Sequence, residues 1–255
     1  MAAPKTEPKI FTGIGLDFET GDLDCLEGAI TQLSMQGIRL DNLELISSYN
    51  KYITPYNKQN IGSPKRKVLR SKHEQNQPTE QMVYKAEALK YSGITMDKLI
   101  KQGVDIMEVG NDVISFAKDC TLSNGKNTKP VLIGQNITFD VGFLQQLMNY
   151  TGLVKEFEKV FAGKKDFYGN FQPHYIDTID LARFIFANDP TVTSYKLEMI
   201  AELLGLELDD AHDADADVTA TLNIMRISVN RLRIGDTQEG NIIHKREKTR
   251  SYFKI

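Results

Sequence analysis

Carboxylate side chains gather at three places in this sequence, and such groups are preferred ligands of hard divalent cations. The first place is Asp17-Phe18-Glu19, which ends an apolar stretch that starts at Ile10. Side chains alternate between the two faces of a β-strand, so Asp17 and Glu19 are expected on one side and Phe18 in the core. Oxygen atoms on one face suit Mg²⁺. The spacing predicts a metal site, although a solvated strand end would show the same pattern.

The other two places hold a single acid, and a histidine followed by an acid. Asp140 comes after the apolar residues 131–134 and starts an expected helix, where an acid also stabilises the helix dipole with no other function. His212 and Asp217 lie in the run Ala-His-Asp-Ala-Asp-Ala-Asp. A histidine can take a proton from water, and a nearby carboxylate can hold the metal that positions that water. The alternative is an acidic helix N-terminus without a catalytic role.

Strands and helices must position these residues. Apolar and β-branched stretches predict strands at residues 10–18, 29–40, 43–53, 131–133 and 175–176, with a short turn at Asp41-Asn42. Helical periodicity predicts helices at residues 80–91, 105–119, 177–187, 194–204 and 214–232, one from about Thr138, and a short one after Thr95. Thr95 and Ser194 are expected to cap their helices. This order predicts an α/β domain with a mixed sheet covered by helices, and functional sites at the carboxyl ends of its strands.

One domain is expected to account for most of the 255 residues. We expect an N-terminal tail at residues 1–9, a domain at 10–233 and a basic C-terminal tail at 234–255. Residues 55–79 contain proline, glycine and few apolar side chains, which predicts a long loop. Residues 152–172 are expected to be a second loop with at most one helical turn.

The formal net charge of −3 argues against a protein that coats DNA through bulk electrostatics. It is compatible with an enzyme that touches a few nucleotides. Basic residues cluster at residues 65–72, which are either a guide for a single strand or a solvated loop. They also cluster at residues 245–254, which either dock on a partner such as a DNA polymerase or sliding clamp or are disordered.

Two features bear on location. No apolar run approaches the ~18 residues that cross a bilayer, so we expect no membrane association, and the N-terminal residues lack the apolar segment of a secretory signal. The two cysteines, Cys25 and Cys120, are too few for a disulfide framework and lack metal-ligand spacing. We expect two packing thiols in a reducing, cytoplasmic protein.

Taken together, the clusters give the order Asp-x-Glu, Asp and His-x-x-x-x-Asp, which resembles the DEDDh branch of the 3′–5′ exonucleases. That family includes the proofreading epsilon subunit of bacterial DNA polymerase III and RNase T. The resemblance covers about residues 10–230 and includes five motifs: residues 16–21, residues 92–95, Asn136 with Phe139-Asp140, residues 177–183 and residues 195–197. One departure is Gln135, which stands where many members have histidine. The other is the length of the two expected loops.

The resemblance implies an RNase H-like fold and a two-metal active site. Two Mg²⁺ or Mn²⁺ ions would be held by Asp17, Glu19, Asp140 and Asp217, and His212 would be the general base. Asp217 is preferred to Asp213 and Asp215 because its spacing from His212 matches the family. Five residues are implied as substrate contacts: Phe18, Thr20, Gly21, Asn136 and Phe139. The side chain of Phe18 is nevertheless expected in the core, and Thr20 is expected to use its backbone.

The implied reaction removes nucleoside monophosphates from the 3′ end of a single-stranded nucleic acid. DNA is the first expectation, in proofreading or repair. An exoribonuclease that trims RNA ends is the second, and only tolerance of the 2′-hydroxyl would separate the two. A catalytically silent scaffold that binds nucleic acid or a polymerase is the third. It is disfavoured because all five reactive side chains are present.

Overall fold

A computed structural model describes residues 9–58, 80–125, 127–206, 208 and 213–234. A five-stranded sheet lies at its centre, in the order β3-β2-β1-β4-β7. The strands are β1 (Thr12–Thr20), β2 (Ile30–Arg39), β3 (Leu45–Tyr52), β4 (Val131–Gly134) and β7 (Tyr175–Asp177). The pairs β1–β2 and β2–β3 are antiparallel, and the pairs β1–β4 and β4–β7 are parallel. The sheet is therefore mixed, as predicted.

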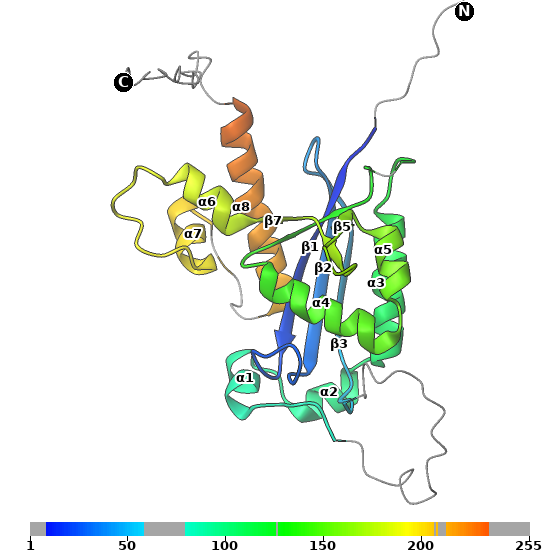
Figure 1. Cartoon of the computed structure of the whole chain (residues 1–255). Helices are drawn as coiled ribbons and strands as arrows, with labels where there is room; N and C mark the ends of the chain where they lie inside the picture. The colour runs from blue at the N-terminus through cyan, green and yellow to red at the C-terminus, as the bar shows by residue number, and fades with distance from the viewer. Residues whose placement is uncertain (1–8, 59–79, 126, 207, 209–212, 235–255) are drawn as a thin grey trace, which may run out of the picture.

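Helices cover both faces of this sheet (Figure 1). They are α1 (Ala86–Tyr91), α2 (Met96–Gln102), α3 (Ile106–Asp119), α4 (Thr138–Thr151), α5 (Val154–Val160), α6 (Thr178–Ile185), α7 (Leu197–Leu204) and α8 (Ala214–Ile234). The main core joins the sheet to α3, α4 and α5, and a second cluster joins the opposite face to α8. Helices α6 and α7 pack on α8 in a third cluster. The predicted α/β fold is confirmed.

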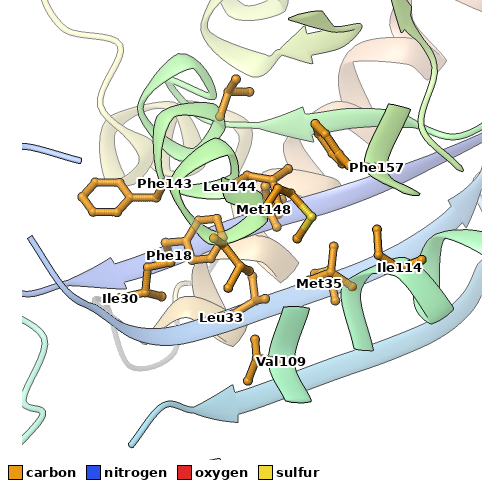
Figure 2. Packing of buried hydrophobic residues seen from close by; sticks show 14 of the residues in the cluster. Phe18, Ile30, Leu33, Met35, Val109, Ile114, Phe143, Leu144, Met148 and Phe157 are labelled. Carbon is orange, nitrogen blue, oxygen red and sulfur yellow. The ribbon is translucent and has the colours of Figure 1, made fainter. Parts of the chain in front are cut away.

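The main core is built on alternate residues of β1 and β2. Phe18 of β1 and Leu33 and Met35 of β2 point to the same side, toward Phe143 and Met148 of α4 (Figure 2). Because β-strand side chains alternate, the neighbouring residues face α8 instead. Cys120 is fully buried in this core, as expected for a packing thiol, and Cys25 packs partly against it.

Segment 80–91 is helical only from Ala86, so the prediction for residues 80–85 was wrong. The backbone of Val83 donates to Glu27 O (3.0 Å) and accepts from Ala29 N (3.0 Å), while Met82 is buried and donates to Tyr56 O (3.2 Å). Pairing with a distant segment holds these residues extended. Tertiary contacts of this kind override local helical periodicity.

The prediction of a loop at residues 152–172 was also wrong. This segment forms α5 and most of an antiparallel hairpin of β5 (Gly163–Lys165) and β6 (Phe171–Pro173). The ring of Phe157 lies 5.0 Å from that of Phe161 and 5.2 Å from that of Phe171, measured between centroids. Aromatic packing between the helix and the hairpin stabilises both elements.

Smaller differences concern turns and caps. Strand β3 begins only at Leu45, and Leu43 is buried with φ +63°, so the connection is longer than the expected Asp41-Asn42 turn. Thr95 accepts from Lys98 N (3.1 Å) and caps α2 as predicted. Ser194 does not cap α7: its hydroxyl accepts from Lys196 N (3.3 Å), and Lys196 itself is the N-cap residue.

Several predictions fall outside the described residues. These are the basic run at 65–72, almost all of both tails and His212. The domain boundaries therefore stay predictions. Within the described part of the chain, no helix combines the length and apolarity needed to span a membrane.

Candidate active site

Three carboxylates meet at the carboxyl end of β1. Asp17 and Glu19 come from alternate positions of the strand and face α8, where Asp217 lies in the first turn. One oxygen from each residue lies within 4.8 Å of the others. Asp17 is paired with Ser34 and Glu19 with Gln32 of β2, so the sheet fixes the backbone beneath both acids. The sequence prediction that these acids share one face is confirmed.

Helix α8 approaches β1 closely because Gly15 has no side chain. A β-carbon at Gly15 would lie 3.0 Å from atoms of the Leu222 side chain, tighter than ordinary van der Waals contact. Polar residues of β2 also attach the helix: Gln32 Nε2 donates to Asp213 (3.1 Å), Ser34 Oγ to Asp215 (2.9 Å) and Gln36 Nε2 to Thr219 (2.7 Å). These contacts hold the helix that carries Asp217 over the strand that carries Asp17.

Asp140 reaches the same place from the first turn of α4. Its side chain is 3% exposed, and Oδ1 accepts from Phe18 N at 3.0 Å. The pairing of β1 with β4 ends at Gly15, so this N–H has no strand partner and the carboxylate satisfies it. Asp140 therefore lies against the backbone between Asp17 and Glu19.

The acids perturb one another strongly. Burial, followed by the charges of Asp217 and Asp213, raises the pKa of Asp17 to about 7. Burial, followed by the charges of Asp17, Asp217 and Asp213, raises the pKa of Glu19 to about 8. Burial and the charge of Asp17 hold the pKa of Asp140 well above its usual range. Crowded carboxylates with raised pKa values are the environment that a bound cation relieves.

The three aspartates at the start of α8 have different surroundings. Asp213 Oδ1 accepts from Asp215 N (3.0 Å) and so caps the helix, and its other oxygen binds Gln32. Asp215 binds Ser34. Only Asp217, among these three, has an oxygen close to those of both Asp17 and Glu19. This placement agrees with the preference for Asp217 that the sequence spacing gave.

The acids lie in a cleft of about 1230 Å³. Four of the five expected substrate contacts line it: Phe18, Thr20, Asn136 and Phe139. The Phe18 side chain is buried, as expected, with its ring 6.4 Å from that of Phe143. Asn136 is exposed and adopts φ +55°, with its N–H donating to Asp177 Oδ1 (3.2 Å).

Gly21, the fifth expected contact, has a packing role in this structure. Its N–H donates to Ala29 O (2.7 Å) and its carbonyl accepts from Lys85 N (2.8 Å). A β-carbon at this position would collide with the carbonyl oxygen of Val83. Glycine is needed here because two backbone segments pass within contact distance.

Sequence reasoning missed the basic and aromatic residues of the cleft walls. Lys85 and Tyr91 line one wall, and Arg183, Tyr195 and Lys196 line the other. Motif spacing marked residues 177–183 and 195–197 as family features but gave these side chains no role. Only the folded arrangement brings them to face the acids across one cleft.

Gln135 joins the second wall to the sheet. Its Nε2 donates to Tyr195 O (2.6 Å), and its Oε1 accepts from the hydroxyl of Thr178, which is fully buried and also bonds Gly134 O (3.2 Å). The residue that departs from the usual family pattern thus fixes the segment that carries Tyr195 and Lys196.

A mixed sheet covered by helices on both faces, with clustered acids at the end of its first strand, is the architecture of RNase H-like nucleases. Residues 14–225 match the sequence profile of the exonuclease family RNase T. The chain therefore belongs to this family of DEDD-type 3′–5′ exonucleases, which confirms the family predicted from the sequence.

Individual relatives support this assignment over parts of their length. The chain is 30% identical over 130 residues to the 3′–5′ exonuclease DinG of Staphylococcus epidermidis, which covers 51% of the chain and 11% of DinG. It is 29% identical over 104 residues to a PolC-type DNA polymerase III of Clostridium perfringens, covering 40% of the chain and 6% of that polymerase. The chain thus spans a small part of both relatives.

The fold also matches a solved exonuclease. E. coli exonuclease I in complex with a dT13 oligonucleotide superposes with a TM-score of 0.60 at 17% identity, over 88% of this chain and 42% of that one. At this level of identity the likeness concerns the fold.

Proposed function

We propose that this chain hydrolyses single-stranded DNA from its 3′ end and releases nucleoside monophosphates. The observation that carries the proposal is the meeting of Asp17, Glu19 and Asp217, with oxygens within 4.8 Å of one another, in a chain of an exonuclease family. DNA is preferred because one relative is a DNA polymerase and exonuclease I was solved with a DNA oligonucleotide.

Asp17, Glu19, Asp140 and Asp217 would hold two divalent cations, Mg²⁺ or Mn²⁺. The fit rests on the donor set: carboxylate oxygens are the ligands these ions prefer, and the raised pKa values of Asp17 and Glu19 reflect charge that a cation would balance. When bound, such a pair of ions stabilises both the attacking and the leaving oxygen of an in-line phosphoryl displacement.

The chain's own residues would supply proton transfer and positioning. By resemblance, His212 accepts the proton of the attacking water, and it immediately precedes Asp213, which caps α8. Thr20, Asn136 and Phe139 would contact the terminal nucleotide from the cleft lining. Positive charge from the walls would offset the repulsion between the acids and the phosphate backbone.

RNA is the second candidate substrate, because the matching family is named after a ribonuclease. A silent scaffold is disfavoured. Burial and mutual repulsion of the acids are unfavourable, as the raised pKa values of Asp17 and Glu19 reflect, and a protein without catalysis would not need this cluster. Association with a polymerase or clamp through the C-terminal tail is an additional proposal, motivated by the PolC-type relative.

Degradation of 5′-labelled oligonucleotides tests the proposal. Purified protein is incubated with matched single-stranded DNA and RNA, with Mg²⁺ or Mn²⁺. We expect a ladder that shortens from the 3′ end, faster on DNA, and its loss with EDTA or Asp17→Ala. Asp41→Ala, an exposed acid paired with Arg39, is the matched control and should keep full activity. No shortening of either strand with either metal would overturn the proposal.

A further inference from the structure

Two aromatic rings project into solvent at the tip of the β5–β6 hairpin. Phe167 is 96% exposed and Tyr168 is 84% exposed, the highest values among the large apolar side chains of the described residues. Their rings pack edge to face, with centroids 5.4 Å apart and an interplanar angle of 86°. Single exposed apolar residues are common on protein surfaces, whereas adjacent exposed rings form a contiguous apolar surface of the kind that contacts a ligand.

Hydrogen bonds hold the backbone of the turn that carries these rings. Asp166 Oδ1 accepts from the backbone N–H of both Tyr168 and Asn170, each at 2.9 Å. The Asp166 N–H donates to Asn170 O (2.9 Å), and Gly169 closes the turn with φ +85°. Such a preorganised turn loses little conformational entropy when a ligand binds.

The hairpin packs beside α4, the helix that begins at the active site. Gln145 Nε2 of α4 donates to Phe171 O of β6 (3.4 Å), and Figure 1 shows the hairpin beside this helix. Gln145 lies five residues beyond Asp140, a rise of about 7.5 Å along the helix axis. A strand leaving the cleft along α4 would reach the hairpin within a few nucleotides.

Helix α4 carries no carboxylate after Asp140. Thr138, Gln145 and Asn149 lie on the outward side of α4, at spacings of seven and four residues that place them on one helical face. All three are polar and uncharged. A phosphate backbone following this stripe would meet hydrogen-bonding groups without repulsion.

The chemistry of the tip favours a nucleic acid over a protein. Lys164 and Lys165 are exposed directly before the tip, and Lys165 also pairs with Glu158 (3.0 Å). The carboxylate of Asp166, also in the tip, accepts hydrogen bonds from Tyr168, Asn170 and Gln172. No aliphatic residue occurs in the run Lys-Lys-Asp-Phe-Tyr-Gly-Asn that forms the tip, although an apolar protein groove would favour them. Aromatic rings with neighbouring cations are the combination that binds single strands through base stacking.

We propose that the β5–β6 tip is an accessory binding site for single-stranded nucleic acid, which holds bases several nucleotides upstream of the 3′ end on Phe167 and Tyr168. The inference rests on the proposed function for the identity of the ligand. Its consequence is a length effect: strands long enough to reach the tip bind more tightly than strands that fill only the cleft.

Tryptophan fluorescence tests this directly. The chain contains no tryptophan, so Phe167→Trp introduces a single reporter at the tip. In an Asp17→Asn background that prevents degradation, a 20-nucleotide single strand should quench this fluorescence, and a 4-nucleotide strand should not. Absence of quenching at concentrations of the 20-mer that saturate the protein by anisotropy would overturn the proposal.

Kinetics give a second measurement. Phe167→Ala with Tyr168→Ala should raise KM for the 20-mer by about 10-fold or more, as expected from loss of base stacking, with kcat unchanged. Activity on the 4-mer should be unaffected. The ring-conserving swap Phe167→Tyr with Tyr168→Phe should retain wild-type KM, as should Phe11→Ala, an exposed aromatic before the opposite end of β1.

The outcomes separate this proposal from the proposed function. Degradation of the 20-mer with unchanged KM in the alanine variant would overturn the accessory site alone, and would point to a protein as the partner of the tip. No degradation of any strand would overturn the exonuclease proposal, while quenching would still report binding at the tip.

Discussion

The two faces of β1 differ sharply although they share one backbone. The face toward α3 and α4 carries three apolar side chains that are at most 4% exposed: Ile14, Leu16 and Phe18. The face toward α8 carries two glycines and then two acids: Gly13, Gly15, Asp17 and Glu19. One face stabilises the fold by burying apolar surface, and the other places carboxylates where their pKa values rise. The apolar packing on one side of the strand thus offsets the unfavourable burial and repulsion of the carboxylates on the other.

The largest expected effect concerns the acid face. Asp217→Asn should lower the rate of 3′-end hydrolysis by roughly 10³-fold, because a metal ligand supplies several kcal/mol of charge stabilisation. Asp215→Asn should stay within about 10-fold of wild type, because Asp215 binds Ser34 and its loss leaves the acid group intact. Single-turnover rates on single-stranded DNA give the comparison. A fully active Asp217→Asn beside an inactive Asp215→Asn would reverse the assignment.

The apolar face should show the opposite behaviour. Phe18→Ala should lower the free energy of unfolding by about 3–5 kcal/mol, because it empties a site packed against Phe143 in the main core. Asp17→Asn, one residue away, should unfold at the same or a higher urea concentration in EDTA, since it removes a repelling charge. Urea titrations followed by circular dichroism measure both. Equal destabilisation by the two variants would contradict the division of roles between the faces.

The closeness of α8 to the acid face can be tested at Gly15. Gly15→Ala should cost about 1–3 kcal/mol in unfolding free energy, because the new methyl group crowds Leu222. Adding Leu222→Ala should recover part of that loss, a coupling that a double-mutant cycle measures. Strict additivity of the two substitutions would show that Gly15 is needed for some other reason.

The sequence alone predicted the strand that carries the acids, because alternation along an apolar strand is a local property. It predicted most helices for the same reason, since the spacing of apolar residues reports which side of an element is buried. The order of these elements along the chain predicted the mixed sheet. It failed at residues 80–85 and 152–172, where pairing with Glu27 and Ala29 and packing among Phe157, Phe161 and Phe171 decide the structure. The backbone pairing joins segments far apart in the sequence, and the contact of Phe157 with Phe171 joins a helix to a hairpin, so neither follows from a local apolar pattern.

The same distinction applies to the site. The acid residues were predicted from their types and spacing, and Asp217 was preferred because its spacing from His212 matches the family. The bond from Phe18 N to Asp140 was not predictable, because it depends on where β4 stops pairing with β1. The basic and aromatic residues of the cleft walls come from the start and end of α1, from α6 and from the segment that Gln135 fixes. No local pattern gives those side chains a shared cleft.

The last expected effect is the pH dependence of stability without metal. Asp17 and Glu19 have pKa values of about 7 and about 8 in the folded protein, above their ordinary values of 3.8 and 4.5. The folded state therefore binds these protons more tightly than the unfolded state. Their contribution to stability is fully present below about pH 4 and is lost as the pH rises through about 8. In EDTA, the Tm should fall across this range.

Substitutions and added metal show how much of this pH dependence of Tm comes from Asp17 and Glu19. Asp17→Asn with Glu19→Gln should flatten the fall in Tm between pH 5 and pH 8.5, because the substituted amides do not titrate. Mg²⁺ should raise the Tm of the wild-type protein most at the upper end of this range, where the carboxylates are ionised and free to bind it, and should have little effect on the double variant. A Tm that rises with pH in EDTA would show that repulsion among the carboxylates does not destabilise the folded protein. The two sides of β1 would then differ in packing alone.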